Sequence, residues 1–178
     1  IHTPASRDSS FGQNDDEAYL ELLKNANEND IDIIGITDHF SIEGFKKLME
    51  IKDEAANTIS TVKKKRYAQQ SQDLIKELEE NLNLFKNIHI LPGVEFNVDP
   101  GIHINTIFNE SVSISKMKNF LKSLELENDF NYGDPKVKTK AGILIFIDIL
   151  YDYFDDNDFF VYAPHIDSSS GIIEGLKE

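Results

Sequence analysis

Apolar residues recur along this chain at two spacings, one typical of helices and one typical of strands. Apolar positions at i, i+3, i+4 and i+7 mark amphipathic helices, and Asp15 or Asp16 can cap the first of them. The expected helices cover residues 15–27, a segment that begins at Ser41, and residues 71–86 and 113–126. Residues 141–154 are so apolar that periodicity cannot separate helix from strand, and their length favours a helix.

Short apolar runs between these helices predict strands at residues 31–36, 88–98, 102–108 and 159–163. Pro92 and Gly93 are expected to interrupt the second strand, and the polar residues 128–140 are expected to form a loop. Strands that alternate with helices predict an α/β fold with a largely parallel sheet, in which ligands gather at the carboxyl ends of the strands. No repeat or linker divides the chain, so we expect one domain over residues 1–178.

The amino-acid composition limits which kinds of binding site this chain can form. The chain has no cysteine, so a metal ion would have to be held by nitrogen and oxygen ligands. Its formal net charge is −14, which disfavours extended nucleic-acid binding by this domain alone. The one basic run, KKKR at residues 63–66, is interpreted as a solvated surface. No apolar run approaches the roughly 20 residues that cross a bilayer, and no signal sequence is present, so we expect a soluble, cytoplasmic protein that makes no membrane contact.

Four of the five histidines and one glutamate stand at polar breaks in apolar, strand-like runs. They are His2, His39, His103, His165 and Glu95. A single histidine at the end of a strand is more often a hydrogen-bonded structural residue than a metal ligand. Their joint placement favours a metal site, because burying a carboxylate or imidazole without a partner costs roughly 2 kcal/mol or more. Coordination of shared cations would satisfy all of these side chains together.

The motifs that carry these residues resemble those of the PHP (polymerase and histidinol phosphatase) domain family. The matching segments, in chain order, are Ile1-His2-Thr3, Ile36-Thr37-Asp38-His39, Gly93-Val94-Glu95 followed by His103, and Ala163-Pro164-His165. The first of them matches if a histidine precedes Ile1. The resemblance spans the chain from its first residue to near its last, and it rests on the order and spacing of all four motifs.

The resemblance implies a distorted (β/α)7 barrel of the TIM-like type, incomplete in this chain, whose rim holds two to three metal ions, commonly zinc, manganese or iron. It also implies a metal-dependent phosphoesterase of the phosphatase or nuclease type. A metal-activated water would attack a phosphorylated small molecule, a nucleotide or a nucleic-acid end. Closely spaced divalent ions can supply this chemistry without a serine or cysteine nucleophile.

The family's metal ligands carry over to individual residues of this chain. The resemblance implies that His2 binds the first metal and that Glu95 bridges the first and second. His103 and His165 would complete the second site.

Further roles also follow from the resemblance. His39 would hold the third metal with Asp8, and Asp38 would orient a neighbouring ligand, although Asp38 could equally cap a helix. Arg7, beside Asp8, could hold the substrate phosphate, although an arginine that is simply exposed is the more frequent case. His89 matches no motif and is interpreted as structural.

The chain departs from the family pattern near both ends. The first histidine of the first motif would precede Ile1, and the family's late Asp-any-His pair of ligands has no counterpart before Glu178. Asp167 lies too close to His165 to replace that pair. We therefore expect the remaining barrel strands to lie beyond this chain, the other explanation being a degenerate site that binds fewer metals.

Residues 4–6 and 165–171 most resemble PHP domains that precede a large ATPase of the SMC-like or AAA-like type. A C-terminal ATPase region in the same protein is the expectation that follows. Two alternatives to a phosphoesterase remain open. One is a catalytically impaired PHP module with a structural or regulatory role in the larger ATPase, and the other is an α/β binding protein with incidental histidines.

Overall fold

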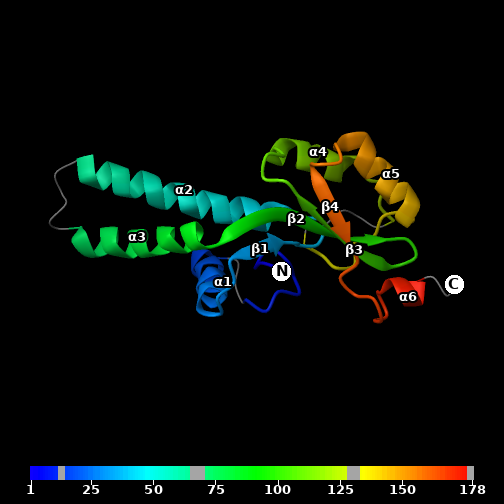
Figure 1. Ribbon diagram of the computed structural model, residues 1–178, viewed down its shortest axis with the longest axis horizontal. Helices are drawn as coiled ribbons and strands as arrows, with labels where there is room; N and C mark the ends of the chain where they lie inside the picture. Colours follow the sequence, from blue (N-terminus) through cyan, green and yellow to red (C-terminus); the bar gives the residue numbers. More distant parts are fainter. Residues whose placement is uncertain (12–14, 65–70, 128–132, 176–178) are drawn as a thin grey trace.

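Helices and strands alternate along the chain in the computed structural model, which describes residues 1–11, 15–64, 71–127 and 133–175 (Figure 1). The elements are α1 (Asp16–Glu28), β1 (Ile33–Ile36), α2 (Glu43–Lys64), α3 (Gln72–Asn87), β2 (His89–Val98), β3 (Ile102–Phe108), α4 (Ile114–Ser123), α5 (Ile143–Tyr153), β4 (Phe159–Tyr162) and α6 (Ile172–Gly175). The expected helices and strands are confirmed, with small shifts at their ends. The Asp15 side chain caps α1 by accepting a hydrogen bond from the Ala18 amide at 3.0 Å. Of the expected loop at 128–140, residues 128–132 lie outside the described residues.

The four strands form one open, mixed sheet in the order β1-β2-β3-β4. β1 pairs parallel to β2, whereas β3 runs antiparallel to both β2 and β4. The expected (β/α)7 barrel and the largely parallel sheet are therefore wrong. Only residues 99–101 separate β2 from β3, and a parallel crossover needs about a dozen residues or more. A connection this short can only form a hairpin, and Gly101 accepts the positive φ of 137° that the turn requires.

Pro92 does not break β2, so the expected interruption is also wrong. It lies where the strand changes partners: residues 89–92 pair with β1, and residues 93–98 pair with β3. A proline inside a strand removes a ladder donor and is tolerated where pairing ends on one side. The proline and glycine therefore mark the change of partner rather than an end of the strand.

All the helices that build the core pack against one face of the sheet. One hydrophobic cluster joins α1, α2 and α3 to Ile34, Ile36 and Ile90, and a second joins α4 and α5 to residues such as Phe96 and Ile104. Figure 1 shows α4 and α5 on one side of β3 and β4, with the short α6 on the other side. Side chains alternate along a strand, so the remaining residues of these strands project from the opposite face. We call this opposite face the open face.

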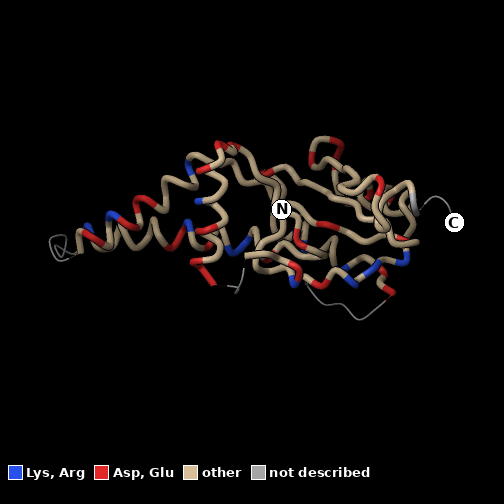
Figure 2. Tube along the Cα trace, turned by 90° about the horizontal axis from the view of Figure 1, so that it is seen from below, with Lys and Arg blue, Asp and Glu red and all other residues tan. Residues whose placement is uncertain are grey.

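α2 and α3 run side by side and extend beyond the sheet (Figure 1). Basic and acidic residues both lie along this pair (Figure 2), and one ion pair joins Lys63 to Glu79 at 2.8 Å. Lys63 belongs to the basic run expected to be solvated. Lys65 and Arg66 of that run lie outside the described residues. None of the helices within the described ranges combines the length and the apolar character that crossing a bilayer requires.

Replacing Gly44 tests how tightly the N-terminal segment is packed against α2. A Cβ at this position would overlap both Asp38 Oδ2 and Thr3 Oγ1, which are hydrogen-bonded to each other. Gly44→Ala should lower the free energy of unfolding by about 2–4 kcal/mol, because it combines overpacking with a broken buried hydrogen bond. Urea unfolding measures this change. Gly142→Ala is the control, since its Cβ would meet only Asp99 O at 3.8 Å, and it should cost at most about 1 kcal/mol. Equal costs for the two variants would contradict the packing described.

Candidate metal centre

The N-terminal segment is fixed beside β1 by hydrogen bonds. The Ile1 amino group donates to Gly35 O at 2.9 Å, and the Thr37 amide donates to Ile1 O at 2.9 Å. The buried Asp38 carboxylate accepts from the Thr3 amide at 2.6 Å and from Thr3 Oγ1 at 2.7 Å. Burial raises the pKa of Asp38, and the bonds from Thr3 oppose that rise. Asp38 thus anchors the residue next to His2, which agrees with an orienting role for it.

His39 is placed by an extension of the β1–β2 pairing. A parallel bridge joins His39 to Glu95, the Glu95 amide donates to Asp38 O at 3.2 Å, and the Phe40 amide donates to Glu95 O at 3.0 Å. The alternation of side chains sends Asp38 toward the helices and His39 toward the open face. Phe40 then turns the chain with a φ of 47° and buries its ring against Phe96, at 5.2 Å between centroids. Because of this turn, Phe40 lies in the hydrophobic core while the neighbouring His39 lies in the site on the open face.

His103 and His165 reach the same edge of the sheet from β3 and β4. β4 is antiparallel to β3, so it runs in the same direction as β1 and β2. The ends of β1, β2 and β4 therefore lie beside the beginning of β3, where His103 is the second residue. His165 follows the end of β4. His39 and His165 follow the carboxyl ends of their strands, as expected, whereas His103 lies near the amino end of β3.

Six side chains from separate segments come together at this edge, and we call them the histidine cage: His2, Asp8, His39, Glu95, His103 and His165. They form two groups, His2–Asp8–His39 and Glu95–His103–His165, and in each group one possible ligand atom per residue lies within 4.8 Å of the others. These are all six of the residues expected to bind metal.

Short contacts link the members of the cage. His39 Nε2 lies 3.0 Å from Asp8 Oδ2, and His103 Nδ1 lies 2.6 Å from Glu95 Oε1. The other carboxylate oxygen, Glu95 Oε2, lies 3.5 Å from His2 Nε2. Glu95 therefore touches both groups, as a bridging ligand would.

Glu95 is the electrostatic centre of the cage. Its side chain is 4% exposed, and among the described residues its ion-pair partners are histidines. Burial raises the pKa of Glu95, but the imidazoles of His103, His2 and His39 outweigh it and hold that pKa far below its ordinary value. Glu95 is therefore ionised at neutral pH.

The pKa values of His39 and His2 are shifted in opposite directions. Burial lowers the pKa of His39, and the Asp8 and Glu95 carboxylates only partly offset it. Burial also lowers the pKa of His2, but the hydrogen bond and charge of Glu95 and the charge of Asp8 reverse the direction, so the pKa of His2 is raised. A lowered pKa favours the neutral imidazole, the form that binds metals.

Two ring nitrogens of the cage lack the partners that a purely structural network would give them. Nδ1 of His39 and Nδ1 of His103 are buried without a hydrogen bond within the described part of the chain. The 2.6 Å contact from His103 to Glu95 is short, but it does not have the direction of a hydrogen bond. Buried polar atoms are nearly always hydrogen-bonded, so imidazole nitrogens that lie beside a carboxylate without a hydrogen bond fit a cation held between them.

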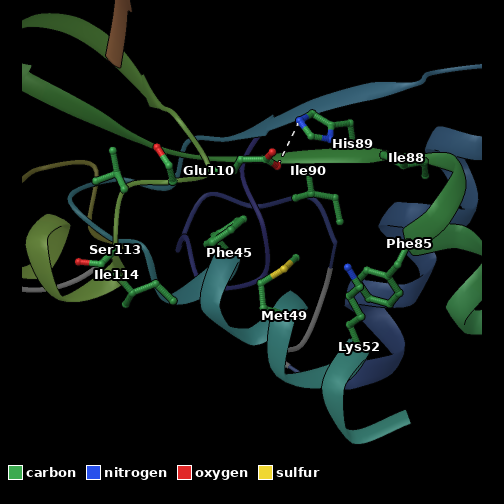
Figure 3. Close-up of a pocket in the computed structure, with 12 residues that line it drawn as sticks. Phe45, Met49, Lys52, Phe85, Ile88, His89, Ile90, Glu110, Ser113 and Ile114 are labelled. Carbon is green, nitrogen blue, oxygen red and sulfur yellow. Dashed lines mark ion pairs between the residues drawn. The ribbon is translucent and has the colours of Figure 1, made fainter. Parts of the chain in front are cut away.

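Two other residues considered from the sequence lie outside the cage. Arg7 is exposed, and its guanidinium bonds Asp134 Oδ2 at 2.8 Å, so in this arrangement the charge is already paired. His89 lies at the other end of β2, where its ring is 3.6 Å from Glu110 on the rim of a hollow of about 430 Å³ (Figure 3). The hollow has an apolar floor that includes Phe45 and Met49, and its lining offers one imidazole and one carboxylate, fewer ligands than either group at the other end of the strand. The histidine cage is therefore a better candidate for a metal site than this hollow.

Sequence reasoning missed several residues around the cage. Ser6 Oγ accepts a hydrogen bond from the His39 amide at 3.2 Å and lies 3.2 Å from His2 Nδ1. Asn97 and Asn105 project from the open face, since Asn97 pairs with His103 and Asn105 pairs with Glu95. The signal was present in the alternation of β2 and β3, which puts both asparagines in phase with Glu95 and His103.

In comparisons with models of known protein families, with curated proteins and with solved structures, nothing matches this chain. Its functional interpretation therefore depends on the geometry of the cage and on the motifs that supply its residues.

Metal titration of single variants tests the two groups separately. His165→Ala should remove binding at one group and Asp8→Ala at the other, whereas Glu95→Ala should weaken both, because its carboxylate touches both. Each loss should exceed about tenfold in affinity for Mn²⁺ or Zn²⁺, since even a ligand's supporting partner contributes 10–100-fold. Calorimetry gives the stoichiometry and the dissociation constants.

His89→Ala is the matched control, because it removes an imidazole from the same strand as Glu95 but outside the cage. Its metal binding should equal that of the unmodified protein. Equal metal content in the Glu95→Ala and His89→Ala variants would show that the cage is a structural network and not a metal site.

Proposed function

We propose that this protein is a metal-dependent phosphoesterase whose histidine cage binds divalent cations. The observation that carries the proposal is the gathering of the six side chains in two groups around the buried Glu95 carboxylate, with Nδ1 of His39 and Nδ1 of His103 buried beside it without a hydrogen bond. The motif resemblance to PHP domains supports the same six ligands, although it assigns His39 and Asp8 to a third ion, separate from the one that His2 would bind. It no longer supports a barrel, since the sheet is open.

The two groups of the cage define which residues would hold the ions. His2, Asp8 and His39 would hold one, and Glu95, His103 and His165 would hold another. Glu95 could bridge to His2, whose Nε2 lies 3.5 Å from it. Imidazole and carboxylate ligands suit zinc, manganese and iron, so the donor set admits each of these. These two groups of three ligands fit two of the two to three ions that the resemblance implies.

Divalent cations, when bound, supply polarisation of a phosphoryl oxygen and a water whose pKa is lowered toward neutrality. The residues of the cage determine its charge and where a substrate can enter. Glu95 keeps a negative charge at the back of the cage, while Asp8 and His165 are exposed at its mouth, where an anionic substrate can enter. No serine or cysteine is then needed to attack the phosphorus.

The substrate is expected to be a phosphorylated small molecule, a nucleotide or a nucleic-acid end. The net charge of −14 opposes long polyanions, so a short substrate suits this chain best. Arg7 could assist in holding a phosphate only by exchanging its bond to Asp134. The resemblance of residues 4–6 and 165–171 to ATPase-linked PHP domains supports an ATPase region as a partner within the same protein.

Hydrolysis of an aryl phosphate in the presence of Mn²⁺ tests the proposal. The unmodified protein should hydrolyse it, and a chelator should abolish the activity. Glu95→Gln keeps the shape of the side chain but removes its charge, and should lower kcat/KM by at least about 100-fold, the scale of losing one preorganised electrostatic group. His89→Ala should keep full activity.

The outcomes separate the alternatives. Metal bound at the cage with no turnover would indicate an impaired PHP-like module with a structural or regulatory role. Neither metal nor turnover would indicate an α/β binding protein with incidental histidines.

A further inference from the structure

The open face carries an apolar hollow beside the histidine cage. It has a volume of about 520 Å³, and its walls include Ile33, Leu91, Ile107, Phe160 and Tyr162. Ile33 is 61% exposed, Phe160 59% and Tyr162 38%. Large apolar side chains gathered on one exposed surface mark a binding site more often than single exposed ones do.

Gly35 and Ile107 line the hollow next to each other, and the Ile107 side chain also covers Gly93. A Cβ at Gly35 or at Gly93 would lie 2.7 Å from Ile107 Cδ1, so the isoleucine side chain lies across both glycines. Phe160 and Tyr162, two residues apart on β4, stack with their ring centroids 5.3 Å apart and an angle of 17° between their planes. The result is a flat apolar surface with an aromatic wall.

One row of paired residues leads from the cage to Tyr162 in the wall of the hollow. Glu95, Asn105 and Tyr162 stand opposite one another on β2, β3 and β4, and Asn105 Nδ2 donates to the Tyr162 hydroxyl at 3.0 Å. Ile107 and Phe160 lie one pleat further along the same face. Strand spacing and rise per residue place the backbone of Ile107 roughly 8 Å and that of Phe160 roughly 12 Å from the backbone of Glu95. One small molecule can therefore reach both the cage and the hollow.

We propose, on the basis of the proposed function, that this hollow binds the planar ring of the phosphate ester whose phosphate enters the cage. The chemical class that combines a phosphate with a flat, largely apolar ring at this separation is a nucleoside monophosphate. Phe160 is the specificity-determining residue, because its exposed ring offers a stacking surface and is not among the cage ligands. The net charge of −14 selects a mononucleotide over a polynucleotide, because only a few phosphate charges need to be offset.

The test compares two esters with the same primary alkoxide leaving group, adenosine 5′-phosphate and ribose 5-phosphate, in the presence of Mn²⁺. The unmodified protein should show a kcat/KM at least about fivefold higher for the adenosine ester, since base–aromatic stacking contributes at least that factor. Phe160→Ala should abolish this preference and leave the hydrolysis of ribose 5-phosphate unchanged.

Two further variants support the comparison. Leu144→Ala removes an 81% exposed apolar side chain from α5, away from the hollow, and should keep the preference. Phe160→Leu keeps apolar bulk without a flat ring, so it should lose most of the preference even if the alanine variant fails to fold. Circular dichroism reports the folding of each variant.

Equal use of the two esters, or an unchanged preference in a folded Phe160→Ala or Phe160→Leu variant, would overturn this inference and leave the proposed function standing. Hydrolysis of the aryl phosphate but of neither ester would also overturn the inference alone, whereas hydrolysis of none of the three would contradict the proposed function as well. A dimer that dissociates in Phe160→Ala, seen by sedimentation with no change in the ester preference, would assign the hollow to contact between copies and also overturn the inference.

Discussion

The structure depends on keeping one carboxylate charged inside the protein. Glu95 lies in the middle of the central strand β2, is buried, and has no Lys or Arg partner among the described residues. An isolated buried charge is strongly unfavourable, so the chain must bring other groups to it. It brings three imidazoles, from the N-terminal segment, from the extension of β1 and from β3. The buried charge thus explains why distant segments meet at this edge of the sheet.

The strand directions make that meeting possible. The β2–β3 hairpin returns the chain antiparallel, so His103 lies one diagonal step from Glu95, and β4 delivers His165 to the same edge. The helices cover the other face, where Phe96 and its neighbours form the core. The face covered by the helices therefore forms the hydrophobic core. The other carries the charged cage and, next to it, the exposed apolar hollow.

Most helices and strands could be predicted from local patterns, because the spacing of apolar residues that marks them is found among residues close together in the sequence. α5 is an example: the length of its apolar segment correctly predicted a helix, whereas periodicity could not distinguish a helix from a strand. The sheet topology was predicted wrongly because alternating helices and strands suggested parallel crossovers. The short segment of residues 99–101 already excluded one of those crossovers, and Pro92 marked where the strand changes partners. The six cage residues were chosen from the sequence, and the structure brings all six together. Strand alternation already placed Asn105 in phase with His103, but its pairing opposite Glu95 and its hydrogen bond to Tyr162 could not be predicted, because they follow from the antiparallel register and not from any motif.

The central claim is that Glu95 and the surrounding imidazoles share divalent cations. The most direct measurement is anomalous diffraction from crystals grown with Mn²⁺, recorded so that manganese positions stand out. The account predicts strong peaks inside the cage, at about 2.0–2.6 Å from Glu95 oxygens and imidazole nitrogens. A cage without an anomalous peak at saturating Mn²⁺, in which Glu95 bonds only to protonated histidines, would contradict it.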